Sequence, residues 1–143
     1  MTAPALAAAA EALVGTPFRL HGRDPETGLD CIGLIECALK AIGRSAEFPN
    51  GYTMRTGNWQ GLEALASIHG FQRMASDHSI DAGDVCLFRP SPAQWHFAIA
   101  ATGRDRFVEA HASLRRVVLM PGPYPFPLIG RWRLTPESSD SGR

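Results

Sequence analysis

Cys31, His96 and His111 are residue types that together can carry nucleophilic catalysis. Cys31 opens the stretch "CIGLIECALKAIG", whose apolar spacing predicts a helix over residues 30–42. A thiol in the first turn of a helix lies among backbone N–H groups that no helix carbonyl accepts. Such a place favours the thiolate, can depress its pKa, and can hold a developing oxyanion. The position therefore suits a reactive cysteine, and a small buried packing residue is the alternative that the helix alone favours.

A cysteine nucleophile needs a base, usually an imidazole that is itself held by a third polar group. Two of the five histidines, His96 and His111, fall in predicted strands. His96 shares its face of the strand with the small residues Ala98 and Ala100. Small residues allow close approach, so we expect a helix to pack on this face and bring a side chain onto the imidazole.

The turn between these two strands sets which residue meets His96. A two-residue turn at Gly103–Arg104, with glycine first, suits a type II′ hairpin and places His96 opposite His111. Directly opposed Cβ atoms lie about 4.5–5.5 Å apart. A turn one position earlier would instead place His96 opposite Glu109. We take His111 as the third residue because glycine-first turns are the better hairpin signal, and Glu109 stays the alternative.

The spacing of apolar residues changes from helical in the first half of the chain to strand-like in the second half, and this predicts the elements that position these residues. Helical spacing predicts helices over 3–14, 30–42 and 59–70. Short runs of β-branched and aromatic residues separated by turn residues predict an antiparallel meander of about five strands. The predicted strands are 84–89, 94–101, 106–112, 115–121 and 129–134. The fold class is α+β, with N-terminal helices packed on a C-terminal sheet.

The predicted helix over 30–42 has clear ends and a clear inner face. Asp30 can cap it, and Gly43 can end it. Cys31 falls on the same side as several apolar residues of the helix and so points toward the sheet, whereas Glu36 and Lys40 fall on the opposite side.

Composition limits the classes of partner. The 143 residues suit one domain over 1–134, followed by a polar tail over 135–143. Fourteen basic and fourteen acidic residues cancel, which argues against a nucleic-acid or anionic-membrane partner. The three cysteines have no CxxC spacing, which argues against a disulfide framework and a zinc site. We therefore expect no metal and no cofactor, and we interpret Cys37 and Cys86 as packing residues.

The N-terminal stretch "MTAPALAAAAEALVG" lacks a basic region, and Glu11 interrupts it. It is typical of an alanine-rich helix rather than of a signal peptide or a membrane span. We expect synthesis in the cytoplasm without a signal peptide.

Four pieces of the sequence, in order, resemble the NlpC family of cell-wall cysteine peptidases. "LVGTPFRLHGRDPETGLDCIGLI" is similar to the family's glycine-threonine segment, loop and D-C-[ST]-G motif, and "DAGDVCLF" to its G-D-[LV]-x-F strand. "HFAIA" resembles the H-V-[GA]-I strand, and "RFVEAHAS" the strand that carries the third residue. The four pieces cover about residues 10–120. The resemblance implies a reduced papain-like fold.

Carried over residue by residue, the resemblance makes Cys31 the nucleophile and His96 the general base. The third residue is His111 if "HAS" is aligned with the family's pattern, and Glu109 if "FVEA" is aligned. Two residues depart from the pattern: Ile32 replaces the usual serine or threonine, and Phe18 stands where many members have a tyrosine. The missing hydroxyl puts in doubt a substrate or oxyanion contact at that place.

The resemblance implies hydrolysis of amide bonds in peptidoglycan stem peptides, near D-glutamyl and diaminopimelate residues. Substrate carboxylates could pair with Arg19, Arg23 or Arg55. The short form resembles peptidases carried by phage tails or gene transfer agents, so phage-tail-like proteins are the expected partners, with action on the cell wall. Two alternatives are a catalytically silent adaptor of such a tail, and an acyltransferase that uses the same thiol.

Overall fold

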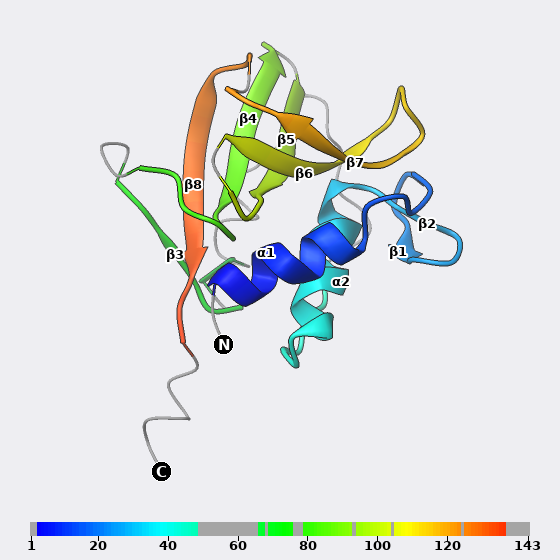
Figure 1. The fold of residues 1–143 in the computed structure, drawn as a ribbon, viewed down its shortest axis with the longest axis horizontal. Helices are drawn as coiled ribbons and strands as arrows, with labels where there is room; N and C mark the ends of the chain where they lie inside the picture. Colours follow the sequence, from blue (N-terminus) through cyan, green and yellow to red (C-terminus); the bar gives the residue numbers. More distant parts are fainter. Residues whose placement is uncertain are drawn as a thin grey trace.

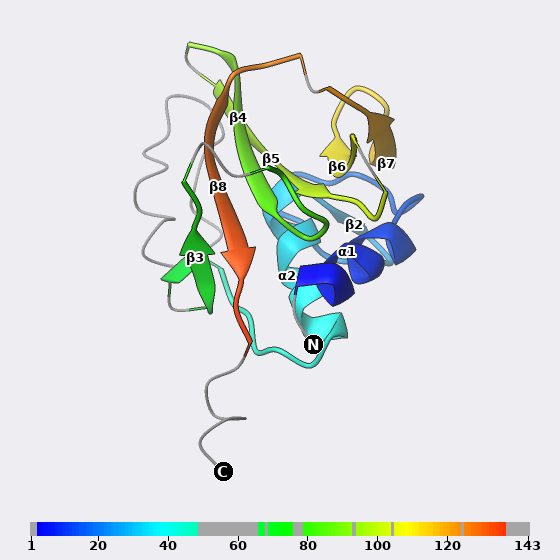
Figure 2. The same ribbon diagram turned by 60° about the vertical axis from the view of Figure 1, so that its left-hand side comes forward.

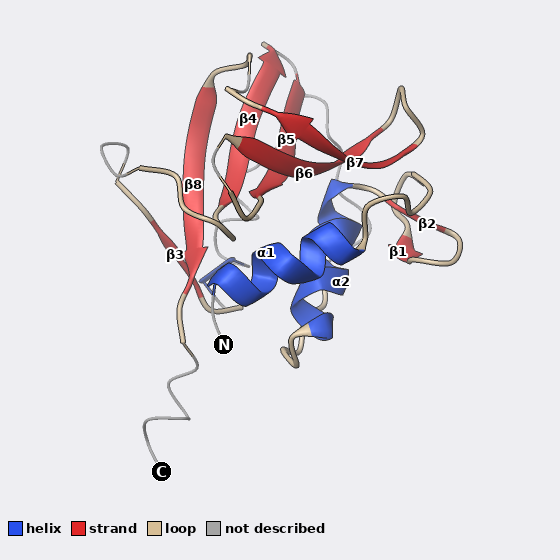
Figure 3. Cartoon of the chain, viewed as in Figure 1, coloured by secondary structure: helices blue, strands red, loops and turns tan. Residues whose placement is uncertain are grey.

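A computed structural model describes residues 3–48, 66–67, 69–75, 79–92, 94–103, 105–123 and 125–136. Over these residues it is an α+β structure in which two helices lie on one side of an antiparallel sheet (Figures 1 and 3). The helices are α1 (Ala3–Ala12) and α2 (Cys31–Ala41). The strands are β1 (Arg23–Asp24), β2 (Gly28–Leu29), β3 (Phe71–Arg73), β4 (Val85–Ser91), β5 (Gln94–Ala100), β6 (Arg106–His111), β7 (Arg116–Pro121) and β8 (Leu128–Leu134). The expected helix over 59–70 lies largely outside the described residues, as does most of the tail.

The ends of α2 are those that the sequence predicts. The side chain of Asp30 accepts a hydrogen bond from the N–H of Gly33 at 2.9 Å, which satisfies a donor of the first turn. Gly43 follows the helix with a φ of 87°, a left-handed conformation that favours glycine.

The sheet has six strands in the order β3-β8-β4-β5-β6-β7, so the expected meander is only partly right. Strands β4 to β7 form a meander, but β8 pairs with β4 rather than with β7. The outer edge of β7 is occupied by the segment 15–18: the N–H of Gly15 donates to Val117, and that of Phe18 to Arg115. The free edge of β4 then takes β8, and β3 adds beyond it, as Figure 2 shows.

The segment 15–18 connects the sheet to the residues that precede α2. Pro17 bridges Arg116 of β7 in antiparallel fashion, and Phe18 bridges Leu29 of β2 in parallel fashion. Leu29 is only two residues before Cys31. These contacts tie the start of α2 to the far edge of the sheet, so the position of Cys31 is fixed by tertiary pairing as well as by its cap.

The two faces of the sheet carry separate apolar clusters. The larger cluster joins Cys31 and the inner side of α2 to Phe97 and Ile99 of β5. The smaller cluster, on the other face, contains Ala98 and Ala100. The expectation that a helix packs on the alanine face is therefore wrong: α2 packs on the face that presents the larger apolar side chains, where it buries more surface.

A buried ion cluster holds the segment before β4 against β8. Asp84 is fully buried and lies 2.8 Å from Nε of Arg133 and 3.5 Å from Nη1 of Arg131. Arg131 also donates to the carbonyl oxygens of Ser79 and Ala75. Buried charges need such pairing, so this cluster holds Ala75, Ser79 and Asp84 against β8.

Candidate active site

Cys31 lies at the first position of α2 with only 3% of its surface exposed. The backbone N–H groups of Cys31 and of Phe97 both stabilise the thiolate form of its side chain. The sulfur therefore lies against β5, beside the residue that follows His96 in the chain. The prediction that Cys31 points inward toward the sheet is confirmed.

A local separation of two strands makes room for this thiol. β5 and β6 pair only near their turn, at Ile99↔Val108 and Ala100↔Phe107. β4 and β5, in contrast, stay paired at Phe88↔His96 and, after a register shift, at Ser91↔Gln94. Toward the start of β5, before Ile99, the strand is no longer paired with β6. The N–H of Phe97 there donates a hydrogen bond to the thiol of Cys31 instead. α2 contacts both strands, so its first turn lies at the opening.

His96 and Glu109 join the two separated strands. Nε2 of His96 lies 2.8 Å from Oε1 of Glu109, a short contact for an imidazole and a carboxylate. The side chain of His96 is 19% exposed and that of Glu109 is 5% exposed. Because a carboxylate can only accept, Nε2 donates in this contact, and in the neutral form of the ring Nδ1 then carries the lone pair.

His111 has a different environment. Its Nδ1 accepts a hydrogen bond from the N–H of Leu114 at 3.1 Å and thereby closes the turn from β6 to β7. The predicted register is nevertheless right, because the observed pairs have the predicted offset. If this register is continued along the two strands, His96 lies opposite His111, and Glu109 is its diagonal neighbour. A long side chain can span that diagonal distance. The structure thus brings Glu109, and not His111, to the imidazole.

Burial raises the pKa of the Cys31 thiol well above its usual range, and the charge of Asp30 adds to the effect. The N–H groups of Phe97 and Cys31, and the charge of Arg23, act in the opposite direction but are weaker. The helix N-terminus alone predicts a depressed pKa for this thiol. That prediction is wrong for this structure, because desolvation outweighs the effect of the N–H groups.

Glu36 is buried, contrary to the expectation of a polar outer side on α2. One of its carboxylate oxygens accepts a hydrogen bond from the N–H of Phe48 at 3.0 Å and lies 3.4 Å from Nε of Arg23. The other lies 3.2 Å from Nζ of Lys40. The segment 42–48 and the β1–β2 hairpin cover this side of the helix, which helical periodicity cannot foresee.

The other residues that the sequence singles out lie in different environments. Arg23 contacts Asp30 and Glu36, whereas Arg19 is exposed. Arg55 lies outside the described residues. Phe18 packs against the larger cluster. None of the three cysteines forms a disulfide. Burial raises the pKa of Cys86 to about 12 and also raises that of Cys37.

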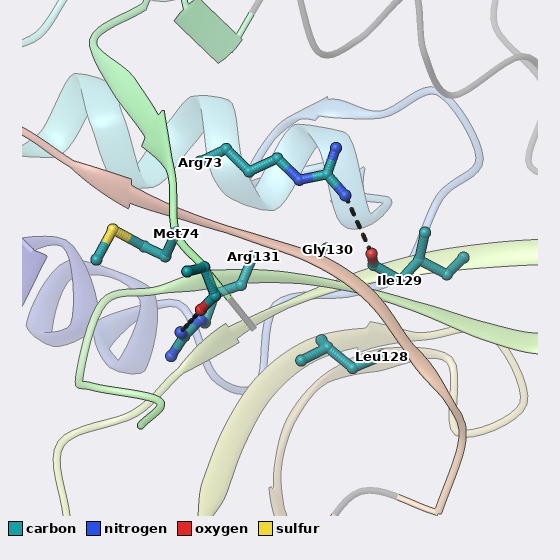
Figure 4. Close-up of a pocket in the computed structure, with 7 residues that line it drawn as sticks. Arg73, Met74, Leu128, Ile129, Gly130 and Arg131 are labelled. Carbon is teal, nitrogen blue, oxygen red and sulfur yellow. Dashed lines mark hydrogen bonds between the residues drawn. The ribbon is translucent and has the colours of Figure 1, made fainter. Parts of the chain in front are cut away.

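A cavity of about 480 Å³ lies between β3 and β8, away from this site. Arg73 reaches across it to the carbonyl oxygen of Ile129 at 3.2 Å (Figure 4). The other lining residues are Met74, Ala75, Leu128, Gly130 and Arg131. β4 separates β8 from β5, so this cavity does not contain the Cys31 thiol.

Within the described ranges, no group of three or more His, Cys, Asp or Glu side chains is arranged to hold a metal ion. None of the helices in the same ranges is long and apolar enough to span a membrane.

The fold is that of NlpC/P60 domains with a papain-like architecture. The NlpC/p60 domain of the peptidoglycan hydrolase SagA superposes with a TM-score of 0.62 over 95% of this chain and 100% of that chain, at 21% identity. The P60 domain of the Mycobacterium avium subspecies paratuberculosis antigen MAP1204 has a TM-score of 0.59, with 90% of each chain covered and 18% identity.

NlpC1 from Trichomonas vaginalis has a TM-score of 0.65 at 19% identity over 89% of this chain. The match covers 43% of NlpC1, so this chain spans less than half the length of that protein. No family model and no curated protein sequence matches the chain.

Proposed function

We propose that this protein is a cysteine peptidase that hydrolyses amide bonds in peptidoglycan stem peptides. The observation that carries the proposal is the contact of 2.8 Å between His96 and Glu109, with the Cys31 thiol against the next residue of the same strand. An NlpC/P60 fold supports this assignment, since SagA, which shares it, is named as a peptidoglycan hydrolase.

In the proposed mechanism Glu109 orients the imidazole through Nε2, and Nδ1 takes the proton from Sγ of Cys31. The thiolate then attacks the amide carbonyl and forms a tetrahedral intermediate. N–H groups at the start of α2 stabilise its oxyanion, each donor contributing about 2.7–4 kcal/mol. The imidazolium returns its proton to the leaving amine, which yields a thioester on Cys31. Water activated by His96 hydrolyses the thioester and restores the thiol.

Burial raises the pKa of the Cys31 thiol and so disfavours a preformed thiolate. We therefore assign His96 the role of a general base at the moment of attack. Family resemblance supports a scissile bond near D-glutamyl and diaminopimelate residues.

The direct test is digestion of defined muropeptides, followed by mass spectrometry. We expect wild-type protein to release the two fragments of the stem peptide, and Cys31→Ala to release none above background. Cys37→Ala is the matched control, because it removes another thiol of the same helix, and we expect it to retain activity. Equal digestion by wild type and Cys31→Ala would refute the mechanism.

A catalytically silent adaptor is the second candidate, and the burial of Cys31 favours it. Iodoacetamide labelling at neutral pH separates the two. Faster labelling of Cys31 than of Cys37 and Cys86 supports the peptidase, because only an adjacent base would activate a thiol so little exposed. Slow and equal labelling supports the adaptor. An acyltransferase would use the same thioester, and products formed with and without an added amine would distinguish it.

We also propose delivery to the cell wall by a phage-tail-like particle, a suggestion that rests on the family resemblance alone. Mass spectrometry of purified particles tests it. The protein should co-purify with the tail proteins, and particles complete in those proteins but lacking this chain would contradict the proposal.

A further inference from the structure

Arg23 of β1 crosses the first turns of α2 and contacts both buried acids of the helix. Its Nη1 lies 3.3 Å from Oδ1 of Asp30, and its Nε lies 3.4 Å from Oε1 of Glu36. The Arg23 side chain is 18% exposed, and those of the two acids are 2% and 6% exposed. Its carbonyl oxygen also accepts a hydrogen bond from the thiol of Cys37 at 3.3 Å.

The charge of Asp30 presents a problem for the proposed nucleophile. Asp30 is needed as the helix cap, yet it places a buried carboxylate directly before Cys31 in the chain. A second negative charge on the sulfur would be repelled by it, and in a poorly solvated place that repulsion is strong. A cation in contact with the carboxylate offsets the repulsion while leaving the cap hydrogen bond intact.

We propose that Arg23 is a positioning residue for Cys31. It neutralises the Asp30 carboxylate beside the thiol, and through Glu36 it holds the first turns of α2 in place. Arg23 therefore acts on the protein's own acids rather than on a substrate carboxylate. The proposal rests on the proposed function only in taking Cys31 as the nucleophile.

The direction of the charges on Cys31 agrees with this role. Asp30 raises the pKa of the thiol, and Arg23 lowers it. The neighbouring elements contribute His96 from β5 and Glu109 from β6, which contact one another. Glu11 of α1 is bound by the N–H and hydroxyl of Thr102. Arg23 is thus a cation in direct contact with the acid next to the nucleophile.

The test measures the rate of Cys31 alkylation by iodoacetamide as a function of pH, which requires no substrate. Arg23→Gln should move the profile to higher pH by half a unit or more, about a threefold loss of rate at a pH below the transition. Arg23→Lys keeps the charge and should show less than half of that shift. A merely structural role would not move the pH profile.

Lys40→Gln is the matched control, because it removes one positive charge from the same Glu36 carboxylate on the solvent side. We expect its profile to match wild type. Asp30→Asn keeps a good cap residue but removes the charge, so it should speed alkylation of Cys31. In a protein that already carries Asp30→Asn, Arg23→Gln should shift the pH profile by less than half as much as it does in the wild type. Equal profiles for Arg23→Gln and wild type, with folding verified by circular dichroism, would overturn the proposal.

If Arg23→Gln does not fold, Asp30→Asn alone decides: unchanged or slower alkylation contradicts the role of the charge. The outcomes also separate this proposal from the proposed function. A shifted profile in a protein that cuts no stem peptide would refute the peptidase and keep the role of Arg23. An active peptidase with an unshifted profile would refute the role of Arg23 alone.

Discussion

At the scale of single residues, the site depends on which side chain holds His96. The sequence singles out Cys31 and His96 as candidates through the start of a helix, a strand position and the family resemblance, and their catalytic roles stay predictions. The third residue could not be selected from the sequence, since His111 and Glu109 lie on the same face of β6. The choice was made by the separation of β5 from β6, a tertiary feature that local turn chemistry does not encode.

The roles of these two residues can be tested separately. Glu109→Gln keeps the size of the side chain but removes its charge, so it should lower kcat/KM for stem peptides about tenfold to a hundredfold, part of what general-base catalysis contributes. His111→Gln should stay within about twofold of wild type, because its ring only closes a turn. A larger loss in His111→Gln than in Glu109→Gln would assign the orienting role to His111.

A buried thiol gives a pH dependence of stability. Burial raises the pKa of Cys86 from 9.0 to about 12, so the folded state keeps a proton that the unfolded state has lost. This contribution is fully present below pH 9 and falls as pH rises toward 12. Between pH 9 and 10 the free energy of unfolding should decrease by up to about 1.4 kcal/mol more in wild type than in Cys86→Ala, as measured by urea titration. Parallel decreases in the two proteins would contradict this assignment.

At the scale of elements, the packing of α2 decides where its first turn lies. The helix, its cap and five strands follow from sequence periodicity. The short strands β1, β2 and β3 do not, because two or three residues carry no periodic signal. Sequence periodicity also does not predict how closely the first turn of α2 approaches the preceding loop. A Cβ at Gly33 would lie only 2.0 Å from the carbonyl oxygen of Gly22.

Gly33→Ala therefore tests this close approach. In a free helix the change would stabilise by about 1 kcal/mol. Here the added methyl group meets backbone that cannot move without displacing the loop, so we expect a lower melting temperature and slower hydrolysis. A melting temperature higher than that of wild type, with full activity, would show that the two backbones are not in contact.

At the scale of the whole molecule, two sets of contacts between distant residues hold the sheet in place. The segment 15–18 pairs with the β7 edge and thereby fixes the start of α2. The ion cluster around Asp84 holds β8, which lies between β3 and β4. The sequence indicates neither, since each depends on residues far apart in the chain. The α+β class itself was predictable because the helical and strand periods occupy separate halves of the sequence.

Removing one member of the buried ion cluster should be costly. Asp84→Asn leaves Arg131 buried with its charge unmatched, so we expect a loss of about 3–5 kcal/mol in the free energy of unfolding. Asp81→Asn is the control, because Asp81 is exposed and also pairs with Arg133, at 3.1 Å. It should cost at most about 1 kcal/mol. Similar losses in the two variants would show that burial does not set the strength of this cluster.

The most direct measurement of the central claim, that Cys31 attacks the substrate with the help of His96, is the detection of the thioester itself. Wild-type protein mixed with a stem peptide and quenched rapidly in acid should carry the acyl fragment on Cys31, identified by mass spectrometry of the peptide that contains it. His96→Gln should carry little or none, since without its base the thiol stays protonated. Hydrolysis of the stem peptide without an adduct on Cys31, at a rate that Cys31→Ala leaves unchanged, would contradict the account.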